Sequence, residues 1–146
     1  MKTKLIFIFL LLLPIAQAIP LQDAEQIIRL VKPEYLNNVC DIELINQSAK
    51  SYQAKAYYNC NGNPLQYKIR IWGYQDLNHY QFRNTLYHEL GHINYFNLKW
   101  EDKIKALNSI WVIDNCYSQL STYKVMEVLA DNFAVKEGYG RSYFFC

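Results

Sequence analysis

The stretch "TLYHELGHINYF", residues 85–96, places His88 and His92 four positions apart, with Glu89 directly after the first histidine. Four residues of α-helix advance about 6 Å and end within about 40° of a full turn. Both imidazoles therefore project from one helix face and can bind one metal ion. Glu89 lies about 100° around the helix, where a carboxylate can act as a general base toward a water at the metal. The pattern H-E-x-x-H thus predicts a zinc-binding helix.

A second feature has to support this prediction, because H-E-x-x-H arises by chance in roughly one chain of this length in a few hundred. The segment "EVLADNFA", residues 127–134, supplies it. Glu127 and Asp131 are again four apart and share a face of a predicted helix. Alone, such a pair is typical of a solvated acidic face. Together with the upstream motif, it predicts Glu127 as the third zinc ligand and Asp131 as the acceptor of the free ring N–H of His88.

Other histidine arrangements fit the sequence less well. The extended motif H-E-x-x-H-x-x-G-x-x-H needs glycine at 95 and histidine at 98, where this chain has Tyr95 and Leu98. His79 is nine residues upstream of His88, near the predicted helix start, so we interpret it as a capping or surface histidine.

The two motifs together resemble the gluzincin class of zinc metallopeptidases, in which H-E-x-x-H on one helix is followed by E-x-x-x-D on a later helix. "EVLADNFA" is similar to the E-x-x-A-D-x-F-A segment of short single-domain members, including ImmA/IrrE-type peptidases and the minigluzincins. The resemblance covers roughly residues 65–138. It implies one Zn²⁺ per chain and a set of roles: ligands His88, His92 and Glu127, general base Glu89, and Asp131 hydrogen-bonded behind a ligand.

Hydrophobic spacing along the rest of the chain predicts an α+β fold with segregated elements. We expect an N-terminal helix, a small three-stranded mainly antiparallel sheet, and then three helices with the metal motif on the first of them. Asn78 and Gln81 form a capping-box pattern at the start of that helix, and Gly138 ends the last one. The predicted ranges are helix 21–31, strands 39–45, 51–60 and 65–72, and helices 79–97, 101–113 and 122–137.

The four cysteines favour two disulfides over a cysteine-rich zinc site, because their number is even and no C-x-x-C pair is present. If the first two predicted strands form a hairpin that turns near Lys50, Cys40 lies opposite Cys60. This register favours a Cys40–Cys60 bridge and leaves Cys116 and Cys146 to tie the C-terminus to the body. Two other connectivities stay open from the sequence.

The first eighteen residues, "MKTKLIFIFLLLLPIAQA", have the three parts of a secretory signal peptide. Lys2 and Lys4 precede a short apolar run, and A-Q-A forms a small-x-small cleavage site. The apolar run is well below the ~20 residues that span a bilayer. We expect cleavage after Ala18, which leaves residues 19–146 as one domain in a secreted, periplasmic or other extracytoplasmic location.

Charge argues against a nucleic-acid or anionic-membrane partner. The chain has 15 basic and 13 acidic residues, and removal of Lys2 and Lys4 leaves 13 of each. Such partners require clustered excess lysine and arginine. The expected partner is instead a peptide or protein substrate, with no stable membrane insertion after signal cleavage.

These observations predict a secreted zinc-dependent metalloendopeptidase, in which Glu89 activates a water at the zinc for attack on a peptide bond. One alternative is a catalytically silent binding module, stabilised by zinc or only by disulfides. Another is an exported toxin or effector that cleaves one host protein. The predicted strand 65–72 either offers a free edge to the substrate or lies inside the sheet.

Overall fold

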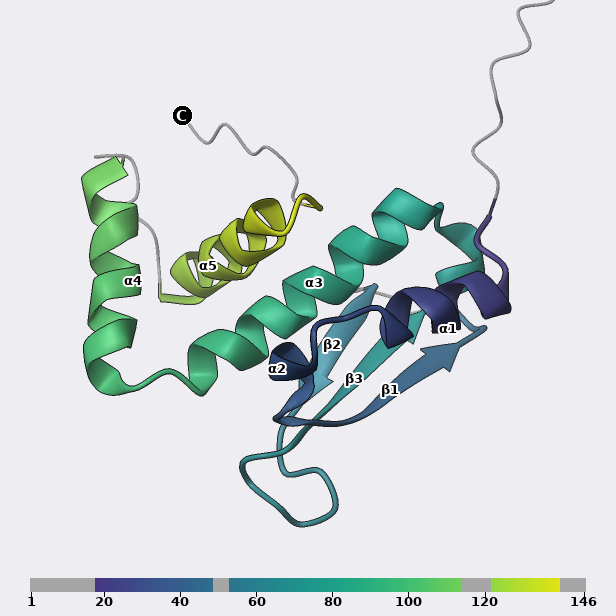
Figure 1. Ribbon diagram of the computed structural model, residues 1–146, viewed down its shortest axis with the longest axis horizontal. Coiled ribbons are helices and arrows are strands. Elements are labelled where there is room, and N and C mark those ends of the chain that lie inside the picture. Colours follow the sequence, from purple (N-terminus) through teal and green to yellow (C-terminus); the bar gives the residue numbers. More distant parts are fainter. Residues whose placement is uncertain (1–17, 49–52, 114–121, 140–146) are drawn as a thin grey trace, which may run out of the picture.

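The computed structural model describes residues 18–48, 53–113 and 122–139, and it has the α+β architecture that the sequence predicts (Figure 1). An N-terminal helical segment precedes a three-stranded sheet, and three longer helices follow it. The predicted element order is therefore confirmed. The elements are α1 Leu21–Arg29, α2 Pro33–Leu36, β1 Val39–Ile45, β2 Ala54–Tyr57, β3 Tyr67–Trp72, the 3-10 turn η1 Tyr74–Asp76, α3 His79–Phe96, α4 Trp100–Ile113 and α5 Thr122–Lys136.

Helix α3 begins with the predicted capping box. The Asn78 side chain accepts a hydrogen bond from the Gln81 backbone N–H at 2.8 Å, and the Gln81 side chain accepts one from the Asn78 N–H at 3.0 Å. Two N–H groups that lack partners within the helix are thereby satisfied. The cap fixes where the helix starts, and hence which face carries the metal motif.

The sheet is mixed, which corrects the prediction of a mainly antiparallel sheet. Its strand order is β1-β3-β2, with β1 parallel and β2 antiparallel to the central β3. The predicted hairpin between β1 and β2 is therefore wrong, because β3 lies between them. The two outer strands do run in opposite directions, as a hairpin would require. Hydrophobic alternation predicts strands but does not select their neighbours.

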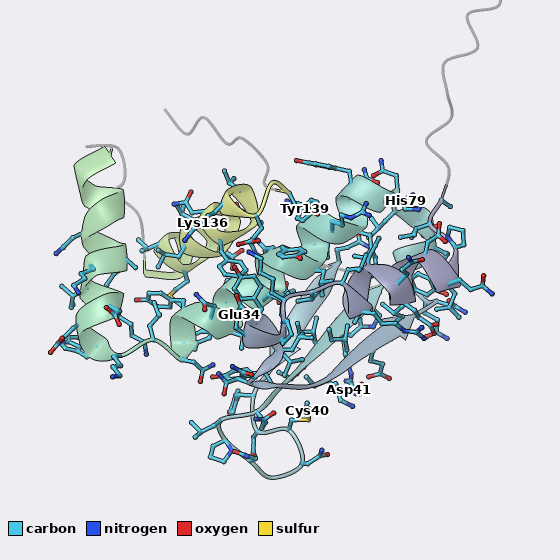
Figure 2. All side chains as sticks on the ribbon, viewed as in Figure 1. Glu34, Cys40, Asp41, His79, Lys136 and Tyr139 are labelled. Atoms are coloured by element: carbon cyan, nitrogen blue, oxygen red, sulfur yellow. A yellow bond between two sulfur atoms is a disulfide. The ribbon has the colours of Figure 1, made fainter. Side chains whose placement is uncertain are left out.

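The Cys40–Cys60 disulfide is confirmed, although the expected register does not produce it. Because β1 and β3 are parallel, both start at the same end of the sheet, and the antiparallel β2 ends there. Cys60 follows β2 in the turn that leads to β3, next to Cys40 near the start of β1. Figure 2 places Cys40 beside this turn. The predicted Cys116–Cys146 bridge lies outside the described residues.

Helix α3 lies between the sheet and α5 (Figure 1). Strand β3 turns Ile69 and Ile71 toward the core, both fully buried, and its other face pairs Arg70 with Glu43 at 2.7 Å. The buried residues of α3 meet this sheet face and α1 in one hydrophobic cluster, which includes Phe82, Leu86, Leu90 and Ile93. The metal motif is thus carried by the most enclosed helix of the fold.

Within the described ranges, no helix is long and apolar enough to cross a membrane. The predicted signal peptide, apart from Ala18, lies outside those ranges, so its cleavage stays a prediction.

Replacement of Asn78 by alanine is expected to lower the free energy of unfolding by about 1 kcal/mol, because the Gln81 N–H loses its acceptor. Urea unfolding of the two proteins measures the difference. Asn78→Ser is the matched control, since serine retains an acceptor for the same N–H. An alanine variant as stable as the parent would contradict the assigned cap.

Candidate metal centre

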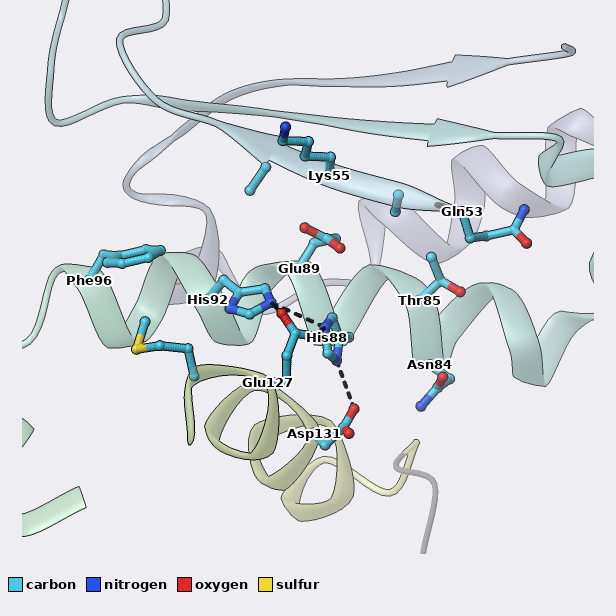
Figure 3. Close-up of a pocket in the computed structure, with 13 residues that line it drawn as sticks. Gln53, Lys55, Asn84, Thr85, His88, Glu89, His92, Phe96, Glu127 and Asp131 are labelled. Atoms are coloured by element: carbon cyan, nitrogen blue, oxygen red, sulfur yellow. Dashed lines mark hydrogen bonds and ion pairs between the residues drawn. The ribbon is translucent and has the colours of Figure 1, made fainter. Parts of the chain in front are cut away.

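Helices α3 and α5 bring the three predicted ligand side chains together (Figure 3). His88 Nε2 lies 3.1 Å from both His92 Nε2 and Glu127 Oε2. His92 Nε2 lies 3.3 Å from Glu127 Oε1. Two residues from one helix and one residue 35 positions after the second histidine therefore converge on one point.

These separations fit a tetrahedrally coordinated metal ion. With metal–ligand bonds of about 2.0–2.1 Å, neighbouring ligand atoms of a tetrahedral site are about 3.3 Å apart. Two imidazole nitrogens and one carboxylate also form a suitable donor set, because all three offer lone pairs. Lone pairs directed at one point repel each other unless a proton or metal ion lies between them. The residues present therefore fit a divalent metal ion.

Asp131 takes the predicted position behind His88. Its Oδ1 lies 2.7 Å from His88 Nδ1, on the opposite side of the ring from the other ligands. An N–H donated from Nδ1 to this carboxylate leaves the lone pair on Nε2, the tautomer that binds a metal. On α5, the candidate ligand Glu127 thus lies four positions before Asp131, which orients the ring of His88.

The charges at the centre shift the titration of its members. Burial alone lowers the pKa of His88, but hydrogen bonds to Asp131 and Glu127 outweigh it and raise the pKa to about 10. Hydrogen bonds from His88 and His92 hold the pKa of Glu127 well below its usual range. Without a metal ion, the centre is therefore an imidazolium held between two carboxylates.

Glu89 lies beside the ligands and outside the ligand group. Its side chain points from α3 toward β2 (Figure 3), and only 7% of the residue is exposed. Burial raises the pKa of Glu89, while the two histidines and the backbone of Ala56 oppose that rise. A raised pKa makes the carboxylate a better proton acceptor, which is what a general base needs.

Gly91 sets the distance between α3 and α5, a role that was not predicted from the sequence. A Cβ at this position would lie 2.8 Å from both Cα and O of Ala130 and 3.0 Å from the Cβ of Phe133. Only glycine lets the two backbones come this close. The signal that could have found it is an isolated glycine inside a strongly predicted helix, which often marks close packing.

Asn84 is a second missed residue. It is buried on α3, and its Nδ2 donates to the Tyr139 backbone carbonyl at 2.6 Å. This bond fastens the chain after Gly138 to α3 and so holds the C-terminal end of α5. The sequence gives no signal for this bond, because nothing near Asn84 indicates a partner 55 positions away.

The sequence offers Tyr123, Tyr139, Arg141 and Tyr143 near the last helix as donors that could stabilise a developing oxyanion, and of these only the Tyr139 side chain belongs to the described residues. The Tyr139 ring packs against Tyr87 with centroids 4.8 Å apart and does not line the cleft at the metal centre. The other candidate donors, Tyr123, Arg141 and Tyr143, have side chains outside the described part of the chain.

His79 is not part of the centre, as expected. Its Nε2 lies 2.8 Å from Asp23 Oδ2, where it joins the start of α3 to α1. Figure 2 shows His79 at the end of α3 nearest to α1. This histidine has a structural contact on the surface.

The metal centre opens into a cleft of about 690 Å³ between α3, α5 and β2. The strand along the cleft is β2, with Ala54 and Ala56 toward α3. For the strand predicted at 65–72, an edge position and an internal position were both open from the sequence, and the structure shows the internal one, because β3 is the central strand. Pockets that bind ligands commonly have volumes of about 300–1,000 Å³.

In comparisons of the chain with protein-family models, curated proteins and solved structures, no match was found.

Replacement of Gly91 by alanine tests the close approach of α3 and α5. In an unobstructed helix this change raises stability by about 1 kcal/mol. Here we expect lower stability and Zn²⁺ affinity reduced about tenfold or more, because α5 has to move and carries Glu127 with it. Chelator competition and urea unfolding measure both. Asn94→Ala, at an exposed position of the same helix, is the control; a Gly91→Ala protein with higher stability and parental affinity would disprove the constraint.

Metal uptake is expected to release a proton from His88. A pKa of about 10 means that this imidazole is protonated at pH 7, and a metal ion needs the Nε2 lone pair. Zn²⁺ binding at pH 7 should therefore release about one proton per chain, and affinity should rise with pH through the neutral range. Titration calorimetry in buffers of different ionisation enthalpy measures the release. Asp131→Asn should release less, and a parent protein that releases none at pH 7 would contradict the assignment.

Proposed function

We propose that the protein is a zinc-dependent metallopeptidase of the gluzincin type. The observation that carries this proposal is the buried Glu89 carboxylate beside a His-His-Glu ligand group at the wall of an open cleft. A purely structural zinc site is normally closed by four protein ligands and needs no adjacent base. Three ligands, a base and access for a substrate are the parts of a hydrolytic site.

Zinc is the metal that this donor set favours. Imidazole nitrogen and carboxylate oxygen at tetrahedral spacing suit Zn²⁺, whereas Mg²⁺ and Ca²⁺ prefer six or more oxygen ligands. The ligand group is also partly accessible, with 36% of the Glu127 side chain exposed. Access leaves room for a water molecule or a substrate carbonyl as the fourth ligand.

Each residue of the centre has a distinct role in this proposal. When bound, zinc polarises the substrate carbonyl and makes a bound water more acidic. Glu89 accepts the proton of the attacking water and passes it to the leaving amine nitrogen. Asp131 keeps the His88 ring in the tautomer that leaves Nε2 for the metal. Gly91 allows α5 to approach α3 closely enough for Glu127 to reach the same metal ion as His88 and His92.

The edge of β2 supports an extended peptide as the substrate. The Trp72 N–H donates to the Gln53 carbonyl, and backbone groups in an antiparallel ladder alternate between the partner strand and the outer side. Ala54 and Ala56 therefore turn their N–H and C=O groups away from β3. These groups face the side where the cleft lies. The Ala56 N–H donates to the Glu89 carboxylate, so the groups that a further peptide strand can use are the N–H and C=O of Ala54 and the C=O of Ala56.

An extracytoplasmic location is part of the same proposal. The Cys40–Cys60 disulfide is typical of proteins that fold in an oxidising compartment. It joins the start of β1 to the turn before β3 and does not touch the metal centre, so it stabilises the sheet without taking part in the reaction.

Glu89→Gln is expected to abolish peptide hydrolysis, with kcat lowered at least ~100-fold, and to retain zinc. The amide has the same shape as the carboxylate but cannot accept the proton. Hydrolysis of a denatured protein substrate is followed together with bound zinc. Glu127→Ala is the companion variant, and it should lose zinc and activity together. Activity in Glu89→Gln equal to that of the parent would remove the proposed base and favour a silent zinc-binding module.

A further inference from the structure

The two ends of the cleft differ in chemistry. Toward the end of α3, its wall includes Phe96 on α3 and, from β2, Lys55, and Met126 next to Glu127 on α5 also lines the cleft. Toward the start of α3, the wall is polar and includes Asn84, Thr85 and Gln53. Figure 3 shows Phe96 and Thr85 on opposite sides of the metal centre along the helix. A bound peptide therefore meets an apolar surface on one side of the centre and a polar surface on the other.

Phe96 is held in place and still presents its ring to the cleft. It lies four residues after His92, on the same helix face. Its ring stacks on Tyr67 of β3, with centroids 6.3 Å apart and planes 7° apart. Nevertheless 47% of the residue is exposed. A large aromatic surface kept in position but left accessible inside a cleft is suited to an apolar ligand group.

Met126 provides an adaptable second wall. It is one residue before Glu127 on α5 and is half-buried. A methionine side chain is flexible and polarisable, so it fits apolar groups of different shape and makes favourable contacts with aromatic rings. Phe96 and Met126 carry no charge and suit a bulky aliphatic or aromatic side chain. The charged Lys55 in the lining of the same cleft lies with its Nζ over the Tyr57 ring.

The direction of β2 decides which part of a peptide meets this surface. Strand β2 runs toward the same end of the fold as α3, since Gln53 lies over Thr85 and Lys55 lies farther toward Phe96 (Figure 3). A peptide that adds antiparallel to β2 runs the opposite way, and antiparallel pairing is the more stable kind. Its N-terminal part then lies at Phe96.

Helix and strand spacing set the position within the peptide. Phe96 is six residues beyond the midpoint of the two histidines, which corresponds to about 9 Å along the helix. An extended peptide advances about 3.4 Å per residue. The side chain that reaches Phe96 is therefore the second or third one before the carbonyl at the metal.

We propose that Phe96 and Met126 form a specificity subsite for a bulky apolar residue at the second or third position before the scissile bond. This inference rests on the proposed peptidase function. It names the class of substrate: an extended peptide segment with a large aliphatic or aromatic residue shortly before the cleaved bond.

A mixture of peptides with randomised sequence tests the proposal. The zinc-loaded protein is incubated with the mixture, and mass spectrometry identifies the residues on both sides of each cut. We expect Phe, Leu, Met or Tyr to be enriched at the second or third position before the cut, with kcat/KM about tenfold higher than for serine at that position. Enrichment after the cut, or none, overturns the proposal while cleavage itself supports the peptidase function.

Variants of Phe96 test the subsite without depending on loss of activity alone. Phe96→Ser should remove the preference, and Phe96→Lys should shift it toward Asp and Glu at the same position. Leu21→Ser is the matched control, because Leu21 is also an apolar residue with 47% exposure but lies on α1. An unchanged preference in both Phe96 variants overturns the assignment.

A binding measurement separates the subsite from the chemistry. The Glu89→Gln protein with zinc is titrated with two fluorescent peptides that differ only by Phe or Ser at the selected position, and anisotropy is recorded. Tighter binding of the Phe peptide, lost in Glu89→Gln combined with Phe96→Ser, supports the subsite. Equal binding of both peptides overturns it. A protein that neither cleaves nor binds any peptide overturns the proposed function together with the subsite.

Discussion

The close contact between α3 and α5 at Gly91 is the constraint on which the candidate centre depends. A Cβ at residue 91 would lie only 2.8 Å from the Ala130 backbone, so the two helices approach each other through main-chain atoms. At that separation the Glu127 carboxylate reaches within 3.1–3.3 Å of both imidazoles. Small residues at a helix contact usually serve packing alone, but here they also set the separation of the candidate metal ligands. Asn84 and Ala134 support the same contact, one by a hydrogen bond to the end of α5 and the other by complete burial.

Electrostatics makes the arrangement stable before any metal binds. Two carboxylates that lie close together and partly out of water repel each other unless a positive charge lies between them. A proton on His88 satisfies Asp131 and Glu127 at once, which raises the pKa of His88 and lowers that of Glu127. A divalent cation can replace this proton at the same point. The folded protein therefore holds the candidate ligands at separations that fit a tetrahedral metal ion.

The sheet positions α3 and borders the cleft, whereas the candidate ligands all come from helices. Because β3 lies between β1 and β2, the short β2 becomes the strand next to the metal helix, and its alanines leave room for Glu89 between helix and sheet. The same strand then borders the cleft with outward-facing backbone groups. The proposed base, the proposed peptide-binding edge and the candidate metal ligands thus lie on α3, β2 and α5, and both β2 and α5 pack against α3 (Figure 1).

The sequence by itself determined helices α1, α3, α4 and α5, the N-terminal cap of α3 and the candidate ligands, because each depends on contacts within a few residues. His88 and His92 share a face through helix periodicity, Glu127 and Asp131 do the same, and Asn78 caps a helix three residues from its partner. Only the tertiary structure decided the strand order, the route to the Cys40–Cys60 bridge and the strand that borders the cleft. Those features depend on pairing between distant segments, for which a repeating apolar pattern gives the same signal in any order. The role of Gly91 likewise depends on tertiary structure. The need for glycine arises from the Ala130 backbone on α5, which lies too close for a Cβ at position 91.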